Sequence, residues 1–173
     1  MNSLPSILPA LEQALSAHDF WGEYLHSLFH GRPHTYNVHL AIFIEPYLEF
    51  VLEEKKTIES RFSITRCAPY RKVNRGDVIL LKRSGGRIIG LCRANQAYYY
   101  ALEPGSLDEI RIRFGEAICP QGNDFWTTRE RASFASLIKI DNVARLPPIQ
   151  FEKRDRRGWV VIGSSTEQEA LAL

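Results

Sequence analysis

A change of hydrophobic period in the middle of the chain constrains its fold most strongly. After Pro46, apolar side chains recur at helical spacing, whereas residues 57–62 alternate, with Ile58 and Phe62 on one side. Proline is tolerated in a first helical turn, so Pro46 suits the start of this helix. The apolar, β-branched residues 38–44 precede it and are typical of a central strand. The sequence therefore predicts a strand, a helix and a strand in succession.

Further short strands and helices follow along the chain. We predict strands at residues 78–82, 87–100, 134–143 and 158–162, and helices at residues 107–115 and 123–133. Residues 84–86 predict a hairpin turn, Gly76 with Asp77 predicts an earlier turn, and residues 147–148 predict a proline loop. This succession indicates an α+β fold: a small, mostly antiparallel β-barrel with flanking helices.

The first 36 residues have a different pattern. Leucines recur there at three- and four-residue steps, so residues 1–36 are predicted to be an N-terminal helical extension. The barrel domain is then expected to span residues 37–163, and residues 164–173 to be a flexible tail. The apolar stripe of the extension needs a partner, either the chain's own barrel or a second copy of the chain in a homodimer.

Cysteine usage and hydropathy indicate the compartment. The three cysteines form no CxxC pair, which is typical of a reducing environment. No leader pattern opens the chain, and no apolar run approaches the roughly 20 residues of a membrane-spanning helix. We therefore expect a cytoplasmic protein without a membrane partner.

Positive charge is concentrated in the middle of the chain. Residues 55–93 carry eleven lysines and arginines but two acids, whereas residues 1–54 carry one arginine and seven acids. A strongly basic segment in a protein of formal net charge +2 is typical of a surface that binds a polyanion such as RNA. Arg66, Arg71 and Lys72 are the candidate phosphate contacts. The alternative is a solvated basic surface.

Tyr98 and Tyr100 share one face of the predicted strand 87–100, because side chains alternate along a strand. They are candidate ligand contacts, since tyrosine rings can stack on an unpaired base. The alternative is that they pack in the core, where we also expect Trp126 and Trp159.

Three charged residues meet at the boundary between the predicted helix and strand. Lys56, Glu59 and Arg61 fall within six residues. In one interpretation they line a ligand cleft, where the cations contact phosphate or a base edge and the carboxylate orients them or accepts from an exocyclic amine. In the other they form an ion-pair network that attaches the helix to the barrel.

The string that contains these residues resembles the signature of the ASCH family, a branch of the PUA-like barrels. That signature reads Gly-x-Lys-x-x-Glu-x-Arg; Lys56, Glu59 and Arg61 match it, and Glu54 stands at the glycine position. The resemblance spans residues 38–162. It implies a PUA-like β-barrel that binds RNA or a nucleotide-like ligand beside the signature.

The later segments 125–126 and 156–161 are also similar to that family. Some ASCH-like proteins are enzymes, so a ribonuclease or a nucleoside amidohydrolase is the alternative, with Lys56 and Glu59 as catalytic residues. The amidohydrolases have a threonine three residues after the lysine, where this chain has Glu59, so the nucleophile of their mechanism is missing. A third interpretation is a protein-interaction module that dimerises through the N-terminal helices.

Histidines in the N-terminal extension carry the remaining pattern of interest. His26 and His30 share a helix face at a spacing that can bind zinc, but no glutamate lies between them as in metalloproteases. We interpret them as a polar helix face and expect neither a metal nor an organic cofactor.

Overall fold

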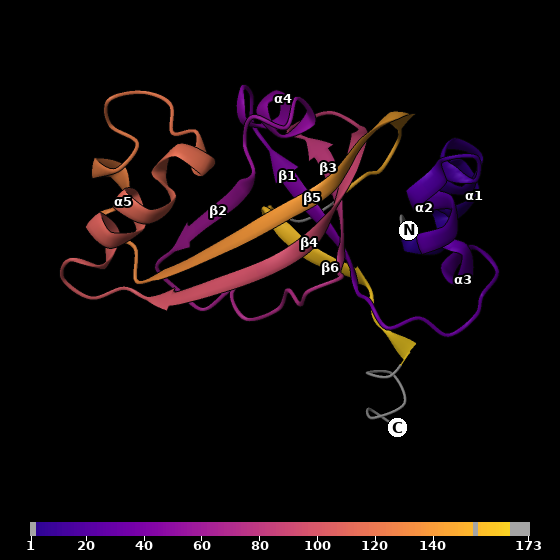
Figure 1. The fold of residues 1–173 in the computed structure, drawn as a ribbon, viewed down its shortest axis with the longest axis horizontal. Helices are drawn as coiled ribbons and strands as arrows, with labels where there is room; N and C mark the ends of the chain where they lie inside the picture. Colours follow the sequence, from indigo (N-terminus) through magenta and orange to yellow (C-terminus); the bar gives the residue numbers. More distant parts are fainter. Residues whose placement is uncertain (1–2, 154–155, 167–173) are drawn as a thin grey trace.

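One mixed β-sheet organises the part of the chain that the computed structural model describes, residues 3–153 and 156–166 (Figure 1). Its strands are β1 (Val38–Phe43), β2 (Ile58–Ser63), β3 (Val78–Arg83), β4 (Ile88–Ala101), β5 (Phe134–Ile149) and β6 (Trp159–Gly163). The helices are α1 (Leu4–Leu15), α2 (Asp19–Tyr24), α3 (His26–Phe29), α4 (Tyr47–Leu52) and α5 (Ser106–Ile118), with a short 3₁₀ turn, η1 (Thr127–Arg129).

The sheet curls into a half-barrel (Figure 1). Its strand order is β2-β5-β4-β3-β1-β6, so β2 and β6 are its two edges. β1 pairs with β3 in parallel, whereas the other strand pairings of the described residues are antiparallel. The long strands β4 and β5 form the central ladder, which runs from Ile88 opposite Ile149 to Ala101 opposite Phe134. The predicted α+β class is confirmed, and the sheet is curled and open rather than closed by strand pairing.

Two predicted elements are wrong. Residues 123–133 are not a helix: apart from η1 they form turns, and the Thr128 hydroxyl and Arg129 guanidinium both donate to the Phe125 carbonyl. Side chains that bond to nearby carbonyls in this way compete with a regular helix. Residues 147–148 are not a loop either, because β5 continues through them. They lie beyond the stretch that pairs with β2 and at a register irregularity of the β4–β5 ladder, and edges and bulges are where strands accept proline.

The N-terminal helices pack against the sheet of their own chain. The apolar side of α1 is buried in the same cluster as strand residues such as Leu40 and Leu80. The Trp21 indole of α2 is fully buried and donates to the Asn142 carbonyl of β5 at 2.9 Å. The apolar stripe is therefore covered within the chain, while the division at residue 36 and dimerisation stay predictions. Residues 167–173 of the expected tail lie outside the described residues.

The predicted turn at Gly76 and Asp77 is a buried anchor for three strands. The Asp77 carboxylate accepts from the Asn37 backbone N–H at 2.8 Å and from His39 Nε2 at 2.9 Å. Trp159 of β6 donates its indole N–H to His39 Nδ1 at 3.0 Å. Since Nδ1 accepts and Nε2 donates, His39 is the neutral Nε2–H tautomer. The bonds connect the start of β3 to β1 and β6, and Trp159 lies in the core as predicted.

No helix among the described residues is both long and apolar enough to cross a bilayer.

Glu54 stands where the ASCH signature has glycine, and the turn that it forms after α4 favours glycine. Glu54 has φ of 58°, a left-handed conformation that costs an L-residue roughly 1–2 kcal/mol and glycine very little. We expect Glu54→Gly to stabilise the fold by about 0.5–1 kcal/mol, because glycine's extra freedom in the unfolded chain offsets part of the gain. Urea denaturation of both proteins measures this change in the free energy of unfolding. Glu54→Ala removes the same exposed charge but keeps the strain; an equal gain in both variants would contradict the argument.

Candidate functional site

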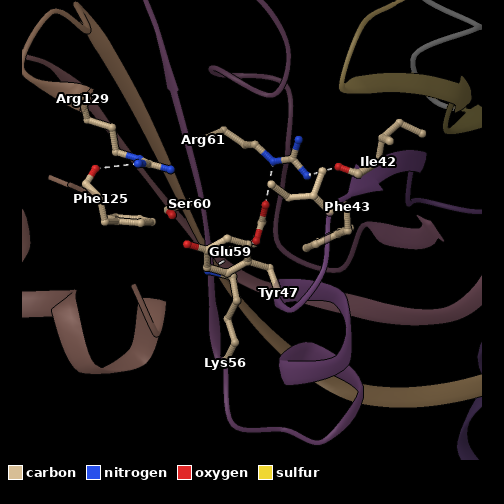
Figure 2. Close-up of a pocket in the computed structure, with 10 residues that line it drawn as sticks. Ile42, Phe43, Tyr47, Lys56, Glu59, Ser60, Arg61, Phe125 and Arg129 are labelled. Atoms are coloured by element: carbon tan, nitrogen blue, oxygen red, sulfur yellow. Dashed lines mark hydrogen bonds and ion pairs between the residues drawn. The ribbon is translucent and has the colours of Figure 1, made fainter. Parts of the chain in front are cut away.

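A pocket of about 240 Å³ opens where β1, the start of α4, β2 and the segment before β5 meet (Figure 2). Its lining residues are Ile42, Phe43, Ile44, Tyr47, Lys56, Glu59, Ser60, Arg61, Phe125 and Arg129. The volume lies just below the roughly 300–1,000 Å³ of typical small-molecule sites. The pocket is therefore large enough for one small chemical group rather than for a whole drug-sized molecule.

Lys56 forms the buried floor of this pocket. Its side chain is 2% exposed, and the ammonium donates to the Ile118 carbonyl at 2.8 Å and lies 3.5 Å from Glu59 Oε2. Burial lowers the pKa of Lys56, although the charge of Glu59 opposes that shift. An ammonium has three N–H donors, so these two contacts leave one for a ligand.

Arg61 spans the opening of the curled sheet. Its Nε donates to Glu59 Oε1 at 2.6 Å, its Nη2 to the Ile42 carbonyl of β1 at 2.8 Å, and its Nη1 to the Gly158 carbonyl before β6 at 3.3 Å. The guanidinium lies 5.1 Å from the centre of the Phe43 ring. These bonds connect edge strand β2 to the opposite side of the sheet, so Arg61 has a structural role in the site as well as a place in its lining.

Arg129 and Phe125 form the wall that faces Arg61, and neither was among the site residues predicted from the sequence. Arg129 donates to the Phe125 carbonyl at 2.6 Å, and its guanidinium lies 3.5 Å from the centre of the Phe125 ring. Burial lowers the pKa of this guanidinium. Figure 2 shows Arg61 and Arg129 on either side of the pocket with Glu59 between them, and the Tyr47 ring in front of Lys56. An arginine in a predicted helix some seventy residues away gives no local sequence signal.

The predicted phosphate contacts lie outside this pocket. Arg66, Arg71 and Lys72 are exposed in the connection between β2 and β3, and none of them lines the pocket. Arg66 stacks on the Phe134 ring at 5.3 Å, and Arg71 on the Tyr70 ring at 5.6 Å. The structure therefore brings Lys56, Glu59 and Arg61 together but leaves these cations apart; their part in binding stays a prediction.

Tyr98 and Tyr100 also lie away from the pocket. Both pack against the apolar cluster at the α5 end of the sheet, with the Tyr98 ring 5.2 Å from that of Phe114 on α5. Their packing agrees with the alternative prediction, in which these tyrosines belong to the core. Trp126 packs partly buried in the same cluster.

No group of three or more His, Cys, Asp or Glu side chains in the described residues is arranged to hold a metal ion. His26 and His30 stack with ring centres 4.2 Å apart, and His30 Nδ1 bonds to the His26 carbonyl.

The pocket combines aromatic walls with a charged floor. Lys56, Arg61 and Arg129 against the single carboxylate of Glu59 give the lining a formal charge of +2. Rings such as Tyr47 can contact a planar face, while the ammonium and the carboxylate supply a donor and an acceptor for its edge. The arrangement therefore suits a planar heterocycle that carries negative charge.

Comparison with solved structures identifies the fold. An ASCH protein from Zymomonas mobilis superposes with a TM-score of 0.59 at 12% identity, over 79% of this chain and 95% of that protein. Two single-substitution variants of the Zymomonas protein have TM-scores of 0.57 and 0.59 at 12% and 11% identity, over 79% and 81% of this chain and 98% and 97% of theirs. No family model and no curated protein matches the sequence. The chain thus has the ASCH fold, as the resemblance implied.

Burial of Lys56 has a consequence for stability. Burial lowers its pKa in the folded protein below the ordinary 10.5, so between those two values the unfolded chain binds more protons than the folded one. The contribution of Lys56 to the free energy of unfolding therefore rises with pH in that window. We expect the stability of the wild type relative to Lys56→Met to increase as pH rises from about 7 toward 10, measured by urea denaturation. A difference that stays constant or falls would contradict this.

Proposed function

We propose that this protein binds RNA or a nucleotide-like ligand in the pocket beside Lys56, Glu59 and Arg61. The observation that carries the proposal is the pair of guanidinium groups, Arg61 and Arg129, on either side of an aromatic pocket with a buried Lys56–Glu59 pair at its floor. The ASCH fold supports a domain of nucleic-acid-binding type. The relation to PUA-like barrels is part of the same proposal.

Each part of the pocket has a role in this proposal. The aromatic walls contact the face of an unpaired base, and Lys56 and Glu59 bond to its edge. Arg129 contacts a phosphate, because a guanidinium has five donors and only some of them are used by the Phe125 carbonyl and the Thr128 hydroxyl. Arg61 donates three hydrogen bonds to other residues of the protein. It therefore holds the site together and adds positive charge.

A catalytic function in the same pocket is the second candidate, and one observation favours it. Lys56 is buried, burial lowers its pKa, and it lies beside a carboxylate in an open pocket. A lysine of lowered pKa can accept a proton from an attacking hydroxyl or water, so a ribonuclease or an amidohydrolase is chemically consistent with this floor. Glu59 would then orient the amine.

One experiment tests both candidates. We expect labelled single-stranded RNA to bind with an affinity that falls with salt, by about 0.7 in the log–log slope for each phosphate contact. Arg129→Gln and Lys56→Met should weaken binding about tenfold or more, since each removes a charge-assisted bond. Arg111→Gln is the matched control, because Arg111 is an exposed arginine on α5, away from the pocket.

Strand integrity is followed in the same samples. RNA that stays intact identifies a binding module, whereas cleavage that disappears in Lys56→Met and in Glu59→Gln identifies an enzyme. Equal weakening by Arg129→Gln and Arg111→Gln would show that the pocket is not the binding site.

A further inference from the structure

A groove continues from the pocket along the free edge of β2. It has a volume of about 590 Å³, more than twice that of the pocket, and shares Ser60, Arg61 and Arg129 with it. From these shared residues it extends past Phe62 to Ile64. The pocket and the groove are therefore adjacent and share one wall.

The lining of the groove is more positively charged than that of the pocket. Arg61, Arg129 and Arg131 line it and no carboxylate does, in contrast to the pocket, where Glu59 lies. Arg131 is exposed and forms no ion pair with any residue in 3–153 or 156–166. The Arg131 guanidinium is therefore suited to a phosphate group.

Apolar side chains alternate with this charge. Ile64 lies in the groove with 70% of its surface exposed, and Phe62 is half-buried beside it. Exposed apolar groups next to guanidinium groups match the repeating pattern of a nucleic acid strand, in which bases and riboses alternate with phosphates.

The backbone of β2 adds hydrogen-bonding groups to the same groove. The Thr57 carbonyl accepts from Ile140 of β5, and the Ser63 carbonyl accepts from Ser133, which directly precedes β5. Residues of an antiparallel pair bond in alternation. The backbone groups of Ser60 and Phe62 therefore point to the open edge, where no strand of the described residues covers them. Main-chain N–H groups of this kind are common contacts of phosphate and sugar oxygens.

We propose that the pocket and the groove bind consecutive nucleotides of one single-stranded RNA rather than a free nucleotide. This inference rests on the function proposed above. One base occupies the pocket, and the following nucleotides lie along β2 with Arg131 at a phosphate and Phe62 and Ile64 against a base or ribose.

The inference predicts that affinity depends on ligand length. We expect the four nucleoside 5′-monophosphates to bind weakly and oligoribonucleotides of increasing length to bind at least tenfold more tightly, until the groove is filled. Arg131→Gln and Ile64→Ser should lower the affinity for oligonucleotides about fivefold and leave that for monophosphates unchanged. Fluorescence anisotropy and calorimetry measure these affinities.

The chain supplies matched controls on α5. Arg111 is exposed like Arg131, and Ile112 is 87% exposed, so Arg111→Gln and Ile112→Ser make the same chemical changes away from the groove. If monophosphates bind as tightly as oligonucleotides, or if Arg131→Gln behaves like Arg111→Gln, the extension is wrong while the pocket function stands. If neither class of ligand binds, the proposed function itself is wrong.

Discussion

The site depends on how the two sides of an open, curled sheet are held together. β2 and β6 are opposite ends of the strand order, and the Arg61 side chain connects β2 to the Ile42 carbonyl of β1 and the Gly158 carbonyl before β6. The guanidinium also lies over the Phe43 and Trp159 rings, at 5.1 and 5.4 Å from their centres. A planar cation with five donors can make these contacts at once, which an ammonium cannot. Because Arg61 fixes the opening, the pocket has a defined width before any ligand arrives.

The two interpretations of the charged triad are therefore not exclusive. Arg61 holds the fold, but Lys56 and Glu59 are 2% and 5% exposed, and dehydrating an ion pair to that degree rarely stabilises a protein more than apolar residues of similar volume. Burial also lowers the pKa of Lys56, although the charge of Glu59 opposes that shift. The proposed function accounts for a pair of this kind, because a ligand in the pocket would form hydrogen bonds with both groups.

Local patterns explain which parts of the fold and site could be predicted from the sequence. The change of period after Pro46 placed α4 and β2, and Lys56, Glu59 and Arg61 meet because they are near neighbours in the chain. Arg129 could not be found in this way, since only the packing of residues 123–133 brings it opposite β2. The alternation that paired Tyr98 with Tyr100 was correct, but which face α5 would cover depends on tertiary packing.

In the proposed function, the segment between α5 and β5 determines the specificity of the site. Phe125 buries its ring in the cluster at the α5 end of the sheet, and the Thr128 and Arg129 side chains satisfy its carbonyl. Phe125 and Arg129 line the pocket, while Thr128, Arg129 and Arg131 line the groove. The segment thus forms one wall of both, whereas the sheet supplies the other. Because the segment takes no part in the strand pairings, changes in its sequence can reshape the wall without disturbing strand register. Under the proposed function, ligand selection would therefore depend on this segment more than on the sheet.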